Sequence, residues 1–167
     1  MRLIHTADWH LGRTLHGHDL TAAHEGFLDW LVGVVRDEHV DAVLVSGDLY
    51  DRALPPVESV QLLDDALARL TELATVIITP GNHDSAARLG FGAALFRDAL
   101  HVVSDPRSSS PPVVVPDAER CDGLLVYPLP YLNPDSARLQ LAHWAAPAED
   151  GSPGSIARSH QAVMSTV

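Results

Sequence analysis

Three short clusters of polar residues carry the ligand types of a hydrolytic metal site. They are Asp8-Trp9-His10, Gly47-Asp48-Leu49-Tyr50-Asp51 and Gly81-Asn82-His83-Asp84. Together they offer carboxylate oxygens, imidazole nitrogens and an amide oxygen, a mixture that suits Mn, Fe, Zn or Mg better than copper. Each cluster taken alone is more typical of a solvated turn with a capping aspartate. Their occurrence at three successive points of the chain is what indicates a metal site.

Each cluster follows a segment with the pattern of a strand. Residues 2–7 predict a short strand, and the apolar runs 41–46 and 75–79 are typical of strands that are buried on both faces. Between them, residues 20–39 and 57–73 place apolar side chains at helical spacing. This alternation favours an α/β fold with a mainly parallel sheet covered by helices, whose ligands gather at the carboxyl ends of the strands. We therefore expect the three clusters to lie side by side.

The rest of the chain gives a weaker pattern. Asp19 or Thr21 could cap the first helix, and Ser85 could cap a third, shorter one. Residues 113–115 and 124–127 predict strands of a second sheet layer. The segment 145–160, rich in Ala, Pro, Gly and Ser, is expected to be mobile, and a helix is expected to start within residues 156–167.

The charged residues exclude several classes of function. The formal net charge is −11, and all 11 basic residues are arginine, so a Walker-type phosphate loop and lysine Schiff-base chemistry are excluded. The acidic balance also argues against nucleic-acid binding through general positive charge. The single cysteine excludes a thiolate metal cluster. With no targeting segment or long apolar stretch, we expect a cytoplasmic protein that makes no membrane contact.

The three clusters resemble, in order and spacing, the motifs of the calcineurin-like metallophosphoesterase superfamily. The matching segments are His5–Gly12, Gly47–Asp51 and Pro80–Asp84. The resemblance implies a two-layered β sandwich flanked by helices. Within the superfamily, Trp9-His10-Leu11-Gly12, and Asp48–Asp51 followed by Pro55-Pro56, are similar to the SbcD family of bacterial DNA nucleases and its archaeal and eukaryotic counterparts.

The resemblance also implies roles for individual residues. Two divalent metal ions, most suitably Mn, are expected. Asp8 and His10 would bind the first ion, Asp48 would bridge both, and Asn82 would bind the second. His83 would lie beside the scissile phosphate as a catalytic residue.

Other polar residues near the clusters have less certain roles, and each has a plain structural alternative. Asp84 could orient His83 from outside the metal shell. Arg13 and Arg52 could contact phosphates, although surface arginines more often make no specific contact. Asp51 could support the metal ligands, face the DNA or cap a helix. We expect three nearby histidines to be solvated or to face a partner: His16, His18 and His24.

By this resemblance the chain is a subunit of an SbcCD-like complex. Its activity would be Mn-dependent exonuclease and endonuclease cleavage of DNA in repair, recombination and replication, with an SbcC-like ATPase as partner, and the chain could form a homodimer. The superfamily pattern continues with a further histidine and a Gly-His-x-His segment, and neither occurs here. We therefore expect residues 1–167 to be the amino-terminal part of the domain, incomplete at the carboxyl end and inactive alone.

Two other functions are compatible with the sequence. The chain could be a different calcineurin-like enzyme that acts on small phosphodiesters or phosphoproteins, which the acidic net charge would suit. It could also be a noncatalytic assembly module, which the missing histidines favour. The segment Trp9–Gly12 argues for the nuclease, and the retained polar clusters argue against a purely structural module.

Overall fold

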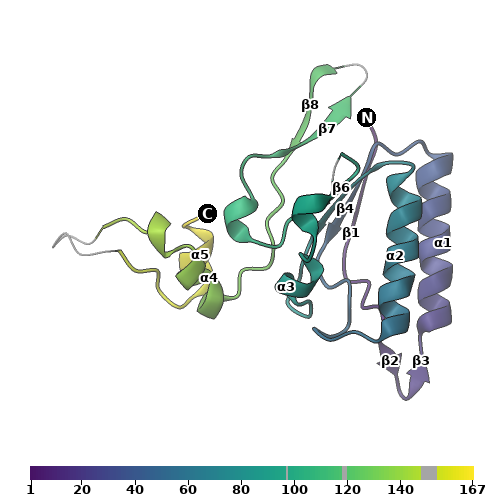
Figure 1. Ribbon diagram of the computed structural model, residues 1–167, viewed down its shortest axis with the longest axis horizontal. Helices are drawn as coiled ribbons and strands as arrows, with labels where there is room; N and C mark the ends of the chain where they lie inside the picture. The colour runs from purple at the N-terminus through teal and green to yellow at the C-terminus, as the bar shows by residue number, and fades with distance from the viewer. Residues whose placement is uncertain (97, 118–119, 148–153) are drawn as a thin grey trace.

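A four-stranded parallel sheet forms the centre of the molecule. The computed structural model describes residues 1–96, 98–117, 120–147 and 154–167 (Figure 1). Adjacent strands of the sheet are parallel, in the order β1-β4-β5-β6, and their bounds are Leu3–Thr6, Ala42–Ser46, Thr75–Thr79 and Leu100–Val102. The parallel α/β architecture expected from the sequence is confirmed.

Two long helices cover one face of this sheet. They are α1 (Thr21–Asp37) and α2 (Val57–Thr71), which lie side by side in Figure 1. Because successive side chains of a strand point to opposite faces, Val43 and Val45 of β4 face these helices. Both valines belong to the main core, together with apolar side chains of the two helices, among them Leu28, Leu31, Val35, Leu63, Ala66 and Leu70.

The opposite face of the sheet is covered by a β hairpin. Strands β7 (Val113–Asp117) and β8 (Arg120–Val126) pair antiparallel with each other. Val115 of the hairpin packs against Ala42 of β4 and Ile77 of β5. This hairpin is the second β layer that the sequence predicted, so the two-layered fold flanked by helices is observed.

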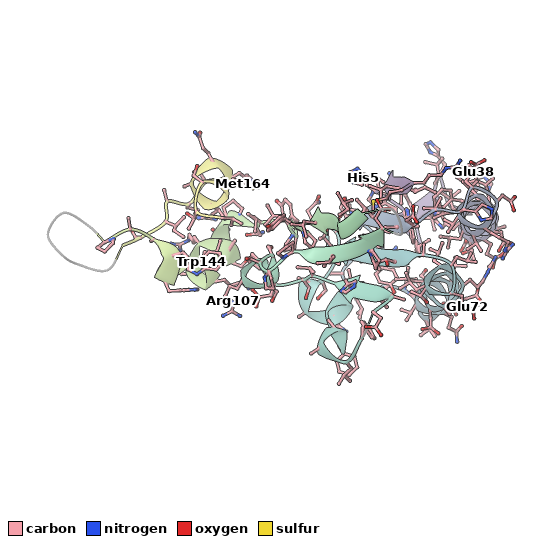
Figure 2. All side chains as sticks on the ribbon, turned by 90° about the horizontal axis from the view of Figure 1, so that it is seen from above. His5, Glu38, Glu72, Arg107, Trp144 and Met164 are labelled. Carbon is pink, nitrogen blue, oxygen red and sulfur yellow. The ribbon has the colours of Figure 1, made fainter. Side chains whose placement is uncertain are left out.

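The carboxyl-side residues form a small separate cluster of helices. Figure 2 shows Trp144 and Met164 of this part at the opposite end of the molecule from Glu38 and Glu72. Its apolar centre contains Leu132, Ala137, Leu141, Ile156 and Val163. Its helices are α4 (Pro134–Gln140), η3 (Ala142–Trp144) and α5 (His160–Met164).

Part of the segment expected to be mobile, residues 148–153, lies outside the described residues. The described residues 145–147 and 154–159 form no helix or strand, and α5 then occupies the place of the expected helix. The remaining short elements are β2 (Thr14–Leu15), β3 (His18–Asp19), α3 (Ala86–Leu89), η1 (Ala93–Leu95) and η2 (Pro106–Ser108). None of the helices described is both long enough and apolar enough to cross a membrane.

Candidate metal centre

The loops that follow β1 and β4 continue to pair after the strands end. The backbone N–H of Asp8 donates to the Gly47 carbonyl oxygen at 3.1 Å. The N–H of His10 then donates to the Asp48 carbonyl oxygen at 2.9 Å, and a bridge between Leu11 and Tyr50 extends the contact. These bonds place the first two polar clusters side by side, as the sequence predicted.

Three of the predicted ligands have a left-handed backbone. The φ angles are 58° at Asp8, 47° at His10 and 51° at Asp48. For a residue with a side chain this region of φ and ψ is sparsely populated and costs about 1–3 kcal/mol, and such residues concentrate at functional sites. Positive φ at three neighbouring polar residues therefore favours a functional site at this edge of the sheet.

Two glycines allow the second and third clusters to touch. A Cβ atom at Gly81 would lie 2.1 Å from Oδ1 and 2.4 Å from the backbone nitrogen of Asp48. A Cβ atom at Gly47 would lie 2.8 Å from the Cα atom of Gly81. Because both positions lack a side chain, the backbone N–H of His83 can donate to Oδ1 of Asp48 at 2.8 Å. The buried Asp48 thus joins the ends of β4 and β5.

Side chains from all three clusters meet at this edge. Ligand atoms of His10, Asp48 and His83 lie within 4.8 Å of one another. The two imidazole rings are 4.9 Å apart and meet edge to face. Nδ1 of His10 is buried and has no hydrogen-bond partner in the described structure. Two imidazoles and a carboxylate form a donor set that suits Mn, Fe or Zn, so these residues fit a divalent metal ion.

Asp8 and Asn82 lie beside this group. The Asp8 side chain is 69% exposed, and its Oδ1 lies 3.7 Å from Nε2 of His10. Asn82 is exposed, and with Asp8 and Asp48 it lines an adjoining cavity of about 420 Å³. Residues of all three clusters therefore border one cavity, and His10 and His83, which do not line it, are related to it through Asp48.

Asp84 holds two loops together. Its carboxylate accepts backbone hydrogen bonds from Leu49 at 3.2 Å, Tyr50 at 3.0 Å and Gly81 at 2.9 Å. The contact that orients the ring of His83 comes from another residue, because Nδ1 of His83 lies 2.8 Å from the backbone carbonyl oxygen of Asp51. Asp84 therefore fixes the loop that carries His83, while Asp51 fixes the ring.

The surroundings of His83 favour its protonated form. Its hydrogen bond to the Asp51 carbonyl oxygen raises the pKa of His83, and the negative charges of Asp48 and Asp51 act in the same direction. The positive charge of Arg13 opposes them. A histidine with a raised pKa is suited to donate a proton or a hydrogen bond to a negatively charged oxygen.

Two residues outside the predicted ligand set, Asp51 and His24, interact with His10. Oδ1 of Asp51 lies 3.6 Å from Nδ1 of His10 and 3.9 Å from Nε of Arg13. His24 is partly buried, and its Nδ1 has no hydrogen-bond partner among the described atoms. Burial lowers the pKa of His24; the charge of Asp19 opposes this effect, and smaller contributions come from His10, which lowers the pKa, and from Asp51, which raises it. The position of Asp51, three residues after Asp48, was a signal in the sequence. His24 was expected to be solvated or to face a partner, whereas the structure partly buries it.

The other predicted residues lie on the surface. Arg13 and Arg52 are exposed, as are His16 and His18, which agrees with the expectation that these two histidines are solvated. Arg13 contacts Asp51 as described above, and Arg52 follows Asp51 directly in the sequence. Arg13 is thus linked to the candidate centre by an observed contact.

Comparison with protein families agrees with this geometry. The family model for the calcineurin-like phosphoesterases matches residues 1–160. The chain belongs to the calcineurin-like phosphoesterase family. Members of this family hydrolyse phosphoesters with divalent metal ions, and His10, Asp48 and His83 are the candidate metal-binding group in this chain.

Proposed function

We propose that the chain is the metal-binding part of an SbcD-like DNA nuclease, which hydrolyses DNA phosphodiesters with Mn as exonuclease and endonuclease in repair and recombination. The observation that carries the hydrolytic part of this proposal is the meeting of His10, Asp48 and His83 within 4.8 Å at one edge of the sheet. The choice of DNA as substrate depends on the resemblance of Trp9–Gly12 and Asp48–Asp51, followed by Pro55-Pro56, to the SbcD family.

The two segments that resemble the SbcD family pack against each other. Leu11 is fully buried and forms a bridge with Tyr50. A Cβ atom at Gly12, where φ is 85°, would lie 2.7 Å from Oγ of Ser59 and 3.0 Å from Cδ of Pro56. The loop that carries His10 therefore sits directly on the start of α2, so the two SbcD-like segments form one structural unit.

In this proposal the polar clusters hold two divalent ions. Asp8 and His10 would hold one ion, Asn82 would hold the other, and Asp48 would serve both. When bound, such ions would supply Lewis-acid activation of a phosphodiester and of a water molecule. A carboxylate suits the bridging position because it has two oxygens, and Asn82 adds an oxygen without adding negative charge.

Although His83 lies close enough to His10 and Asp48 to bind a metal ion, we propose that it acts on the phosphate instead. Its Nδ1 is occupied by the Asp51 carbonyl oxygen, which leaves Nε2 to face the substrate. The raised pKa of His83 favours a protonated ring that can donate to the leaving alkoxide. Arg13 and Arg52 are proposed to contact neighbouring phosphates of the DNA, and an SbcC-like ATPase and a second copy of the chain are the proposed protein partners.

The test is cleavage of a double-stranded DNA end by the protein as its gene encodes it, with and without Mn²⁺. We expect Mn-dependent cleavage that Asp48→Ala and His83→Ala both abolish. His143→Ala is the matched control, because His143 is exposed and contacts Trp144 in the carboxyl-side cluster. Calorimetry with Mn²⁺ separates the two roles: Asp48→Ala should lose metal affinity, and His83→Ala should keep most of it.

Other outcomes would favour other functions. Hydrolysis of bis(4-nitrophenyl) phosphate with no cleavage of DNA would favour a phosphoesterase for small substrates, which the net charge of −11 would suit. Binding of Mn²⁺ with no hydrolysis of either substrate would favour a noncatalytic module. A loss of Mn²⁺ affinity in His83→Ala would make His83 a metal ligand.

A further inference from the structure

The cavity beside Asp48 is lined by residues of two kinds. Asp8, Asp48 and Asn82 contribute polar groups to its lining. Tyr131, and His160 and Met164 of α5, contribute aromatic and apolar groups. Its volume of about 420 Å³ lies in the range of roughly 300–1,000 Å³ that is common for small-molecule sites. With divalent ions held by Asp8, Asp48 and Asn82, as proposed above, the cavity could take an anionic group beside them and a flat or apolar group beside Tyr131.

Tyr131 is attached to the loop of the metal centre. The backbone N–H of Tyr131 donates to the carbonyl oxygen of Pro80 at 2.9 Å, two residues before Asn82. The ring of Tyr131 lies 5.9 Å from the ring of His160, with an angle of 53° between the ring planes. Tyr131 thus connects the polar loop with α5, and its ring lies next to the imidazole.

Helix α5 is held in place by packing and capping. Val163, on the turn after His160, is fully buried in the carboxyl-side cluster with Leu141. Oγ of Ser159 accepts a hydrogen bond from the backbone N–H of Ala162 at 3.1 Å. The packing of Val163 and the cap at Ser159 therefore fix the position of His160 beside the cavity.

We propose that Tyr131 and His160 form a base-stacking subsite for the nucleotide whose phosphate lies at Asp8, Asp48 and Asn82. This inference rests on the proposed function. Stacking on aromatic rings accepts every nucleobase because each base has a π face. The thioether of Met164, a residue that is 53% exposed and also lines the cavity, could add a polarisable contact.

The subsite explains how an acidic protein can hold DNA at the metal centre. A net charge of −11 gives little general attraction for a polyanion, so local contacts must supply the binding energy. Tyr131 is 45% exposed, so its ring keeps surface that a base can cover. The subsite would bind the base of the nucleotide next to the scissile bond without preference for a particular base.

The test is calorimetric binding of two ligands to the full chain in the presence of Mn²⁺. The ligands are 2′-deoxyadenosine 5′-monophosphate and 2-deoxyribose 5-phosphate, which differ only in the base. We expect Tyr131→Ala and His160→Ala each to weaken binding of the nucleotide about tenfold, in keeping with base stacking on an aromatic residue. Binding of the sugar phosphate and of Mn²⁺ should not change.

Matched variants separate stacking from folding. Tyr131→Phe keeps the ring and should bind the nucleotide as the unchanged protein does. Tyr127→Ala removes a tyrosine that is 62% exposed and does not line the cavity, and His143→Ala removes an exposed histidine of the carboxyl-side cluster. Neither control should change nucleotide binding.

Two results would overturn the inference in different ways. If both ligands bind equally well in the presence of Mn²⁺, or if Tyr131→Ala binds the nucleotide like the unchanged protein, the stacking subsite is refuted and the metal site stands. If neither ligand binds and Mn²⁺ does not bind, the proposed function fails and the subsite fails with it.

Discussion

Asp51 contacts the two histidines of the candidate metal centre in different ways. Its side-chain carboxylate lies 3.6 Å from Nδ1 of His10, and its backbone carbonyl oxygen lies 2.8 Å from Nδ1 of His83. Residues that hold the ring of a metal-binding histidine in place commonly tune metal affinity, although they do not touch the metal. Asp51 is therefore a positioning residue for both rings.

Removal of the Asp51 carboxylate should weaken the metal site. We expect Asp51→Ala to lower the affinity for Mn²⁺ by about 10- to 100-fold, as is typical for the loss of such a partner. Isothermal titration calorimetry measures the change. Asp37→Ala is the control, since Asp37 is an exposed aspartate at the end of α1. An unchanged affinity in Asp51→Ala would show that His10 needs no support from this carboxylate.

The raised pKa of His83 should make the stability of the metal-free protein depend on pH. Because the pKa of the folded state lies above the ordinary value of 6.5, protonation of His83 stabilises the folded state. This contribution is fully present below pH 6.5 and is lost as the pH rises through the folded-state pKa. NMR titration of the metal-free protein should give a midpoint above 6.5 for His83.

A matched variant checks the sign of this effect. The difference in free energy of unfolding between the unchanged protein and His83→Gln should decrease as the pH rises above 6.5. A difference that grows with pH, or an NMR midpoint at or below 6.5, would contradict the role assigned to the Asp51 carbonyl oxygen.

At the scale of elements, the close contact between the ends of β4 and β5 depends on Gly81. A methyl group there would collide with both the side chain and the backbone of Asp48. We expect Gly81→Ala to lower the free energy of unfolding by about 1–3 kcal/mol, as overpacking usually does, and to weaken Mn²⁺ binding. Urea unfolding and calorimetry measure the two effects.

Gly26 gives a matched control for this substitution. It lies within α1, and a Cβ atom there would have no neighbour within 4 Å. Gly26→Ala should therefore raise the free energy of unfolding by about 0.5–1 kcal/mol, because alanine restricts the unfolded chain more than glycine does. If Gly81→Ala and Gly26→Ala had equal free energies of unfolding, tight packing of the two loops would not explain why position 81 is a glycine.

The elements that position the site were predictable because their patterns are long and periodic. Strands β1, β4 and β5 and helices α1 and α2 all occur within a few residues of their predicted ends. Ser85 caps α3 as predicted, by accepting from the backbone N–H of Arg88. The cap of α1 differs in detail, since its N-cap is Leu20 and the Asp19 carboxylate accepts from the backbone N–H of Thr21 at 2.6 Å.

The elements that were not predicted are short or depend on distant contacts. The hairpin of β2 and β3 has only 2 residues in each strand, too few to show a period. Helix α4 has 7 residues, and its signals were Asn133 at the cap and Pro134 in the first turn. The pairing of Asp51 with His83 could not be predicted, because it uses a backbone carbonyl oxygen that is the same for every residue type.

At the scale of the whole molecule, apolar side chains are exposed around α2. Leu54 is 67% exposed, Val57 66%, Phe91 85% and Leu95 78%. Leu54 and Phe91 line a cavity of about 730 Å³ between α2 and the segment that leads to β6. Exposed apolar surface commonly marks an interface, and we propose a second copy of the chain, related by twofold symmetry, as its partner. We call these four residues, together with the cavity that Leu54 and Phe91 line, the α2 surface.

The proposed homodimer through the α2 surface should be separable from metal binding. We expect sedimentation equilibrium to show a dimer whose association strengthens with added salt, because each copy carries a net charge of −11 and salt screens their repulsion. The double variant Phe91→Ser and Leu95→Ser should be monomeric and should bind Mn²⁺ normally.

Trp30 provides the control for this experiment. It is 61% exposed on α1 and does not line the cavity of the α2 surface, so Trp30→Ser should leave the dimer intact. A protein that stays monomeric at every concentration and salt would refute the homodimer. A dimer that dissociates in Trp30→Ser but persists in the double variant would instead place the interface on α1. The metal centre belongs to loops at the carboxyl edge of the sheet, so neither result would alter its assignment.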